Sequence, residues 1–249
     1  IYSVDDLIPA KFIVHRALGP DAPLVLNADD PGVVAYAQTL DNRIHWFSLE
    51  ADNPEVLKAL QLGGSACYLD GEGLYYADAD GRREVAHATE IPAALGGAAL
   101  YNVANALAAA SVAIALGLSD TAIRDGLAAF RGDENDNPGR GNWFEHQGVR
   151  ILVDFAHNEH GMKALADTIL RVPSERITLL MGQAGDRLDE DIRDMVHAAC
   201  AVGPDRLLVT ALPGYERGRE LFDVPRLIRE CALEAGVMES SIEILPNPE

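Results

Sequence analysis

Two polar segments in the second half of the chain carry side chains that could bind a charged ligand. Asp154 and His157 come at the end of the apolar run 149–155, and Asp186 and Arg187 follow a second apolar run. Carboxylate and imidazole groups can bind ribose hydroxyls, a metal ion or a phosphate. A guanidinium has the planar shape that suits a carboxylate or a phosphate. These residue types therefore allow a site for a small polar ligand.

Each of these residues also has a purely structural alternative. Asp154 could cap the helix that follows it and leave His157 merely exposed. Asp186 or Asp189 could cap the helix that comes after the glycine turn. Arg140, in the motif NPGR, could be a solvated charge in a loop or a ligand of a site beside that loop. Residue type and spacing leave both interpretations open.

Three further candidates lie in the first half of the chain. Asn102 and Asn105 stand at the start of the alanine-rich segment 101–118, whose spacing predicts a helix. Helix N-termini attract anions and polar ligands, although capping is the usual role of Asn there. Lys11 lies in a short predicted helix, where a plain surface lysine is the alternative.

The composition argues against several classes of partner. The formal net charge of −19 disfavours nucleic acid, whose binding depends on phosphate neutralisation by Lys and Arg, but a small nucleotide site remains compatible with it. No apolar run reaches the roughly 20 residues of a membrane span, so no membrane partner is expected. No signal peptide is visible at the N-terminus. Three scattered cysteines suit a reducing compartment, so we expect a cytoplasmic protein.

The pattern of elements predicts two domains with a boundary in the aperiodic segment 131–142, and we assign residues 1–135 and 136–249 to them. Strands are predicted at 24–26 and 43–49, an antiparallel hairpin region at 66–90, and helices at 101–118 and 119–130.

After the boundary, strands and helices alternate. Strands are predicted near 148–156, 176–183, 205–212 and 241–245, with helices between them. This alternation predicts an α/β fold with a mostly parallel sheet, in which ligands bind beyond the carboxyl ends of the strands. Asp154, the segment 182–187 and the segment 210–217 would then all lie at such ends.

Taken in order, five segments resemble the Mur ligase family, which includes the peptidoglycan amino-acid ligases, folylpolyglutamate synthetase and the C-terminal half of cyanophycin synthetase. The segments are LVLNADDP, LGGAALYNVANALAAASVAIALG, DNPGR, GVRILVDFAHNEHGMKAL and GQAGDRLDEDIRDM. The cyanophycin synthetase version of these motifs is the most similar. The resemblance implies the second half of the family's central domain, a mixed sheet with helices, followed by a Rossmann-like C-terminal α/β domain.

The resemblance also implies an activity, which is the ATP- and Mg²⁺-dependent joining of a carboxylate to the amino group of an amino acid through an acyl phosphate. It places Asn102 and Asn105 at the adenine, Arg140 at the nucleotide and Asp154 at the ribose. His157 would face the phosphates.

For the second substrate, the resemblance implies that Asp186 and Arg187 bind the incoming amino acid, with Arg187 on its carboxylate. Lys11 matches a position where many members carry a carbamylated lysine that binds a second magnesium ion. The implied partners are an amino acid and a carboxylate acceptor such as a peptide or polymer end, and a homo-oligomer is left open.

The sequence departs from the family pattern at both ends. The family's phosphate loop lies well upstream of the Lys11 position, and no GxxxxGK[ST], GxGxxG or GxSxG motif occurs here. The chain also starts without Met and stops at ILPNPE, where the family usually continues. We therefore expect a fragment or a truncated member that is inactive alone. The alternative is a non-catalytic module, derived from a Mur ligase, that binds an amino acid or a nucleotide.

Overall fold

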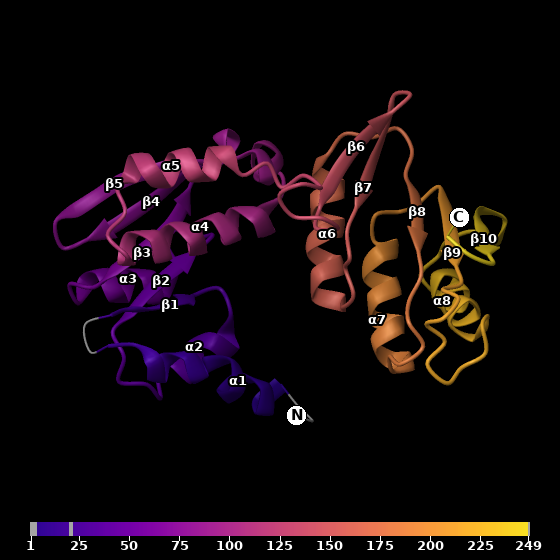
Figure 1. The fold of residues 1–249 in the computed structure, drawn as a ribbon, viewed down its shortest axis with the longest axis horizontal. Helices are drawn as coiled ribbons and strands as arrows, with labels where there is room; N and C mark the ends of the chain where they lie inside the picture. Colours follow the sequence, from indigo (N-terminus) through magenta and orange to yellow (C-terminus); the bar gives the residue numbers. More distant parts are fainter. Residues whose placement is uncertain (1–3, 20–21, 249) are drawn as a thin grey trace. The chain divides into compact units, whose positions relative to one another are not determined.

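The computed structural model describes residues 4–19 and 22–248. The contacts divide the chain into two compact units, Ile1–Gly132 and Asp133–Glu249 (Figure 1). Both units combine helices with sheets, so the predicted α/β class is confirmed. None of the helices within the described ranges is long and apolar enough to cross a membrane.

The first unit is built on a five-stranded sheet in the order β1-β2-β3-β4-β5. Strands β1 to β3 run parallel and β3 to β5 run antiparallel, which confirms the predicted hairpin region. The strands are β1 (Leu24–Asn27), β2 (Ile44–Ser48), β3 (Ser65–Asp70), β4 (Gly73–Asp78) and β5 (Gly81–His87).

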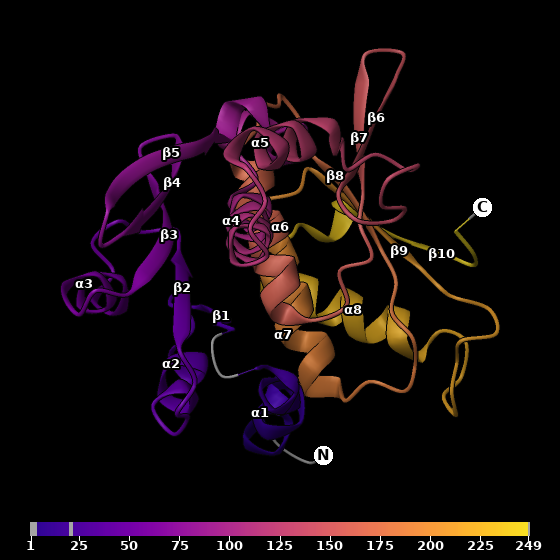
Figure 2. The same cartoon turned by 60° about the vertical axis from the view of Figure 1, so that its left-hand side comes forward.

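Helices cover both faces of this sheet (Figure 2). One core cluster joins the sheet to α4 and α5 through Leu74, Val103 and Ile123. The other packs Trp46 and Val56 on the opposite face, beside α2 and α3. The helices are α1 (Val4–Phe12), α2 (Pro31–Ala37), α3 (Pro54–Gln61), α4 (Leu100–Ala115) and α5 (Asp120–Ala129), with short 3-10 turns at Ile13–Ala17, Ala88–Glu90 and Pro92–Gly97.

Two short helices, α2 and α3, were not predicted, although the sequence signals both of them. Asp30 accepts hydrogen bonds from two first-turn amides of α2, and Asn53 accepts one from the Glu55 amide of α3. A proline follows each of these residues at the first helical position, where its missing N–H costs no helical bond. The Asp-Pro and Asn-Pro pairs therefore mark helix starts rather than plain turns.

The second unit contains a parallel sheet in the order β10-β9-β8, with helices packed beside it. Its core joins Met181 and Leu207 of the sheet to Ile192 of α7 and Ile228 of α8, and Met162 of α6 completes it. The elements are α6 (Glu159–Arg171), β8 (Thr178–Met181), α7 (Asp189–Cys200), β9 (Arg206–Thr210), α8 (Asp223–Glu234), a 3-10 turn at Glu239–Ser241 and β10 (Ile242–Leu245).

One strand lies elsewhere than predicted. The strand at 148–156 was expected in the parallel sheet, but β7 (Val149–Val153) pairs antiparallel with β6 (Asn142–His146) in a separate two-stranded ribbon. The reason is the two-residue turn between them, where Gln147 and Gly148 both have positive φ angles. Such a turn folds a strand straight back on its predecessor. The fold class is unaffected.

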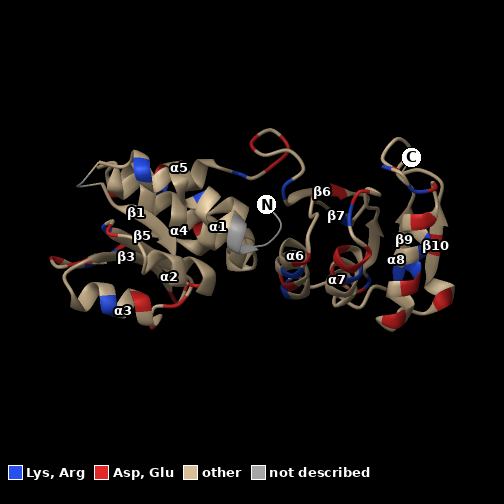
Figure 3. Cartoon of the chain, turned by 90° about the horizontal axis from the view of Figure 1, so that it is seen from below, with Lys and Arg blue, Asp and Glu red and all other residues tan. Residues whose placement is uncertain are grey.

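Acidic side chains outnumber basic ones on both units (Figure 3). They include a group at the start of α7, where Asp189, Glu190 and Asp191 occupy the first turn. Negative charge there is favourable because the exposed amides at a helix N-terminus carry partial positive charge. Part of the high acidity therefore has a local structural use.

His45 on β2 is the buried titratable group with the clearest energetic consequence. Its ring is 3% exposed and stacks on Tyr76, with ring centroids 5.7 Å apart. Its Nδ1 lies 2.8 Å from the Ser65 hydroxyl, and its Nε2 is buried without a hydrogen-bond partner. Burial, and then the positive charge of Arg43, lower the pKa of His45 from 6.5 to about 4. The folded chain therefore holds this ring neutral.

We predict that His45 makes the chain less stable in mild acid. Above pH 6.5 the ring is neutral in both states, whereas between pH 6.5 and about 4 only the unfolded chain takes up the proton. Stability is therefore lost as the pH falls through this window, by up to about 3 kcal/mol. The slope of the free energy of unfolding against pH, measured by urea denaturation at several pH values across the window, should be shallower for His45→Gln than for the original chain. Ser65→Ala, which keeps the imidazole, should retain the slope. Equal slopes for His45→Gln and the original chain would contradict the prediction.

Candidate functional site

The loop that carries Arg140 is an ordered structure rather than a plain linker. Asp133 begins it, because the Asp133 carboxylate accepts hydrogen bonds from the amides of Asn135 and Asp136 at 2.9 and 3.1 Å. Asn142 closes it from the other side, where β6 begins. The Asn142 Oδ1 accepts from the Gly139 amide at 2.6 Å, and its Nδ2 donates to the Asn137 carbonyl at 3.0 Å.

Glycines on both sides of Arg140 set the local backbone. Gly139 and Gly141 have φ angles of +72° and +67°, a region that side chains with a Cβ rarely adopt. The exposed Arg140 therefore stands between two left-handed residues. Its guanidinium lies 5.8 Å from the ring centroid of Phe155.

Phe155 links this loop to the predicted residues after β7. Its amide donates to the Gly139 carbonyl at 2.9 Å, and its ring centroid lies 5.6 Å from that of His157. The ring is 67% exposed, which is high for a phenylalanine beside polar groups. Arg140 and His157 thus contact one aromatic ring, and Asp154 is its neighbour in sequence. The structure therefore brings Arg140 and His157 together at this ring, with Asp154 preceding it in the chain.

Asp154 does not cap the helix that follows it. Asn158 is the N-cap of α6, and its Oδ1 accepts from the Gly161 amide at 2.8 Å. The half-buried Asp154 carboxylate makes no hydrogen bond or ion pair with any residue in the described ranges. Its acceptor atoms therefore remain available for a ligand.

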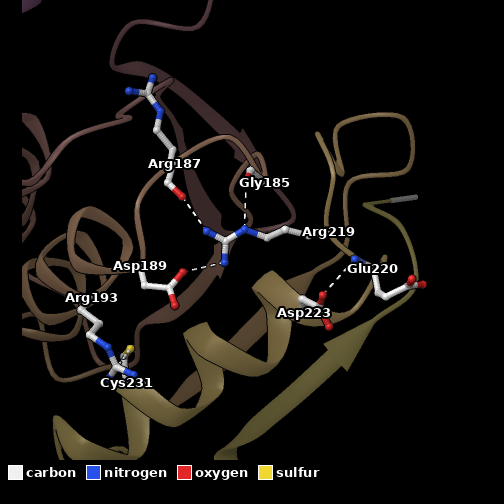
Figure 4. A network of polar contacts seen from close by, with 8 residues as sticks. All are labelled: Gly185, Arg187, Asp189, Arg193, Arg219, Glu220, Asp223 and Cys231. Carbon is white, nitrogen blue, oxygen red and sulfur yellow. Dashed lines mark hydrogen bonds and ion pairs between the residues drawn. The ribbon is translucent and has the colours of Figure 1, made fainter.

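The second predicted segment, 182–187, is held by Arg219 (Figure 4). The Arg219 Nε donates to the Gly185 carbonyl at 2.8 Å, and one terminal nitrogen donates to the Arg187 carbonyl at 2.6 Å. The other terminal nitrogen pairs with the Asp189 carboxylate at 2.6 Å. One planar guanidinium thus fixes the segment at two points and joins it to the first residue of α7.

The glycines of this segment are required by close packing. A Cβ on Gly185 would lie 1.9 Å from the Glu216 carbonyl oxygen, and one on Gly182 would lie 2.8 Å from that of Thr210. The Gly185 amide donates to the Tyr215 carbonyl at 2.9 Å. The segment and the loop after β9 therefore form one backbone-paired assembly.

Asp186 and Arg187 differ in whether their charged groups have a partner. The Asp186 carboxylate forms an ion pair with Arg217 at 3.4 Å. The exposed Arg187 guanidinium points away from the Arg219 network (Figure 4) and has no partner among the residues that the structure describes. Arg187 is therefore the side chain of this segment with unused donors.

In the first unit, Asn102 and Asn105 are hydrogen-bonded to each other at the start of α4. The Asn105 Nδ2 donates to the Asn102 Oδ1 at 3.2 Å, and the Asn102 Nδ2 donates to the Ala93 carbonyl at 2.7 Å. Neither caps the helix, whose N-cap is Ala99 without a side-chain hydrogen bond. The carboxamide of Asn102 is largely occupied, whereas that of Asn105 is exposed and keeps a free carbonyl oxygen.

Lys11 lies in the last turn of α1 and is exposed. In the described part of the chain, no group of three or more His, Cys, Asp or Glu side chains is arranged to hold a metal ion. The residues present thus provide no ready-made magnesium site around Lys11.

Two residues that hold the predicted segments, Asn142 and Arg219, are not among those that the sequence predicts. Asn142 is 2% exposed, and the sequence shows it only as one polar residue in an aperiodic stretch. Arg219 lies in a stretch of alternating charges, RGRE, that reads as solvated surface. No spacing rule signals either residue, since both act on backbone atoms that only folding brings near.

Comparison with known proteins identifies relatives across the chain. The family model for the Mur ligase, glutamate ligase domain matches residues 139–246. A cyanophycin synthetase from Synechocystis sp. is 32% identical over 209 residues, which cover 84% of this chain and 24% of that protein. The chain thus spans about a quarter of the length of this curated relative.

Solved structures with the same fold include two ligases. MurF from Acinetobacter baumannii aligns with a TM-score of 0.63 at 18% identity, over 97% of this chain and 46% of that one. Folylpolyglutamate synthase from Thermotoga maritima aligns with a TM-score of 0.58 at 18% identity, over 93% of this chain and 48% of that one. The family model shows that residues 139–246 are a domain of the Mur ligase family, and the solved structures show that the chain shares the fold of these proteins.

Proposed function

We propose that this chain is part of an ATP-dependent ligase that joins a carboxylate to the amino group of an amino acid. In that reaction the carboxylate attacks the γ-phosphorus of ATP, ADP leaves, and the amine then displaces phosphate from the acyl group. The family match supports the reaction class. The observation that carries the proposal is the grouping of Arg140 and His157 around the exposed ring of Phe155, directly after the unpaired Asp154.

The chemistry of these side chains fits a nucleotide. The Asp154 carboxylate has free acceptor atoms for the two ribose hydroxyls, which are hydrogen-bond donors. The guanidinium of Arg140 can bind phosphate oxygens through a charge-assisted, bidentate contact. His157 contacts the same ring and would face the phosphates. Magnesium would arrive with ATP, since it is commonly bound by substrate phosphates with only one or two carboxylates.

We propose separate roles for the remaining predicted residues. Arg187 would bind the carboxylate of the incoming amino acid, and Asp186 would border that position while it is paired with Arg217. Asn105 and Asn102 would contact the adenine, and a carbamylated Lys11 would bind a second magnesium ion.

A protein that uses ATP and keeps Cys67, Cys200 and Cys231 unpaired would suit the cytoplasm.

A second candidate function is binding without ligation. It is favoured by the location of the Arg140–Phe155–His157 group and the Arg187 segment in one unit, Asp133–Glu249, which could bind both ligands by itself. Because the chain is expected to be inactive alone, phosphate release from ATP in the presence of an amino acid and a carboxylate acceptor separates the two candidates when it is measured on the full-length gene product. Release that depends on both substrates supports the ligase, whereas binding with no release supports the module.

We predict that Asp154→Asn weakens the binding of Mg·ADP by about tenfold, because a neutral amide is a poorer acceptor than a carboxylate. Calorimetric titration measures this loss. ADP that lacks both ribose hydroxyls should bind the original chain as weakly as ADP binds the variant. Asp167→Asn removes an exposed carboxylate from α6 and controls for the change in net charge. If the original chain binds ADP and its dideoxy analogue equally well, the ribose role of Asp154 is wrong.

We predict that Arg187→Gln abolishes the binding of an amino acid, because the variant loses the charged fork that recognises a carboxylate. Saturation-transfer NMR with each standard L-amino acid would identify binders to the original chain. Their carboxamide derivatives should not bind, since they lack the negative charge. Arg176→Gln, another exposed arginine of the same unit, is the matched control. Unchanged binding in Arg187→Gln would place the amino acid elsewhere.

A further inference from the structure

Asn142 is a polar side chain in a place where polar side chains are costly. It is 2% exposed and ranks among the largest fully buried side chains of the described residues, where the others are apolar. Burying a carboxamide without partners costs several kcal/mol in apolar surroundings, so both ends of such a group require hydrogen bonds. In this chain, both ends are directed at the backbone of one loop.

The partners fix the orientation of the carboxamide. The Gly139 amide can only donate, so it requires the oxygen, and the Asn137 carbonyl can only accept, so it requires the NH₂ group. Each bond holds one side of the turn that Pro138 and Gly139 make. Because Arg140 follows directly, its backbone is set from one side by the Asn142 carboxamide and from the other by the start of β6.

The same turn is joined to the end of β7. The carbonyl of Gly139 accepts from the Phe155 amide at 2.9 Å while the amide of Gly139 donates to Asn142. Gly139 therefore links the Asn142 carboxamide to Phe155 through two hydrogen bonds. The ring of Phe155 contacts Arg140 and His157. Asn142 is the one member of this chain of contacts that solvent, and hence a ligand, does not reach.

We propose that Asn142 is a positioning residue of the nucleotide site, whose carboxamide holds the 137–141 turn so that Arg140 meets the phosphates of a nucleoside diphosphate beside Asp154 and His157. The inference rests on the proposed nucleotide-binding function and deepens it. Asn142 acts through Arg140 and touches no ligand itself.

The test is a double-mutant cycle on the whole chain, read by calorimetric titration with Mg·ADP and with adenosine. Asn142→Ala should weaken ADP binding by about tenfold and leave adenosine binding within about twofold, because only the phosphate contact is displaced. Combined with Arg140→Ala, it should cause no loss beyond that of Arg140→Ala alone. Additive losses, or equal losses for ADP and adenosine, would show a general structural role and overturn the proposal.

A matched control is available in the other unit. Asn53 is also buried, at 7% exposure, and its carboxamide likewise accepts from one amide and donates to a backbone carbonyl, those of Glu55 and Ala28. Asn53→Ala should lower thermal stability without changing the ratio of ADP to adenosine affinity. A changed ratio in this control would mean that loss of stability alone explains the effect of Asn142→Ala.

Hydrogen exchange separates failure of this inference from failure of the proposed function. Protection of the Phe155 amide should fall at least tenfold in Asn142→Ala and stay unchanged in Asn53→Ala, with no ligand present. Unchanged protection in Asn142→Ala overturns the positioning role whatever the affinities show. If the original chain binds neither ADP nor adenosine, the proposed function fails, and the nucleotide role of Asn142 is overturned with it.

Discussion

The second unit depends on a simple constraint, which is that a buried carboxamide must satisfy its donor and its acceptor. Asn142 meets it with two backbone groups of the preceding turn, and the turn in turn holds the amide of Phe155. An arginine, an aromatic ring and a histidine are thereby arranged at the end of a two-stranded ribbon. The ribbon supplies little burial, since Val149, Ile151 and Val153 are all more than 40% exposed. Specific hydrogen bonds therefore carry more of the local order here than apolar packing does.

The two arginine-containing segments of this unit show how folding divides similar side chains between structural and available roles. Arg219 donates hydrogen bonds to two carbonyls and a carboxylate, and Arg217 is paired with Asp186. Arg187 belongs to the same assembly and keeps its guanidinium exposed. A ligand that binds a planar cation could therefore contact the Arg187 guanidinium. The contacts of Arg219 and the Arg217–Asp186 ion pair fix the backbone that carries Arg187.

The first unit uses the opposite strategy. Its five-stranded sheet is covered on both faces, and its polar groups at the sheet edge are satisfied internally. The Asp29 carboxylate after β1, for example, accepts hydrogen bonds from Ser48, Leu49 and Asn53. Only the exposed Asn105 at the start of α4 and the exposed Lys11 on α1 retain free polar atoms among the residues predicted there. Few of the predicted polar groups of this unit are therefore available to a ligand.

The sequence by itself determined the class of fold, most of the elements and the family. Periodicity located the helices α4 to α8 and the strands of both sheets, because burial of one face repeats at a fixed spacing. The order of short motifs was enough to recognise a Mur ligase relative. Tertiary structure alone decided that β7 turns back on β6, since a turn with two positive φ angles overrides the apolar pattern of the strand. It also decided that Asn142 holds the 137–141 turn and that Arg219 holds the segment 182–187, because their partners are backbone atoms whose position no residue type reveals.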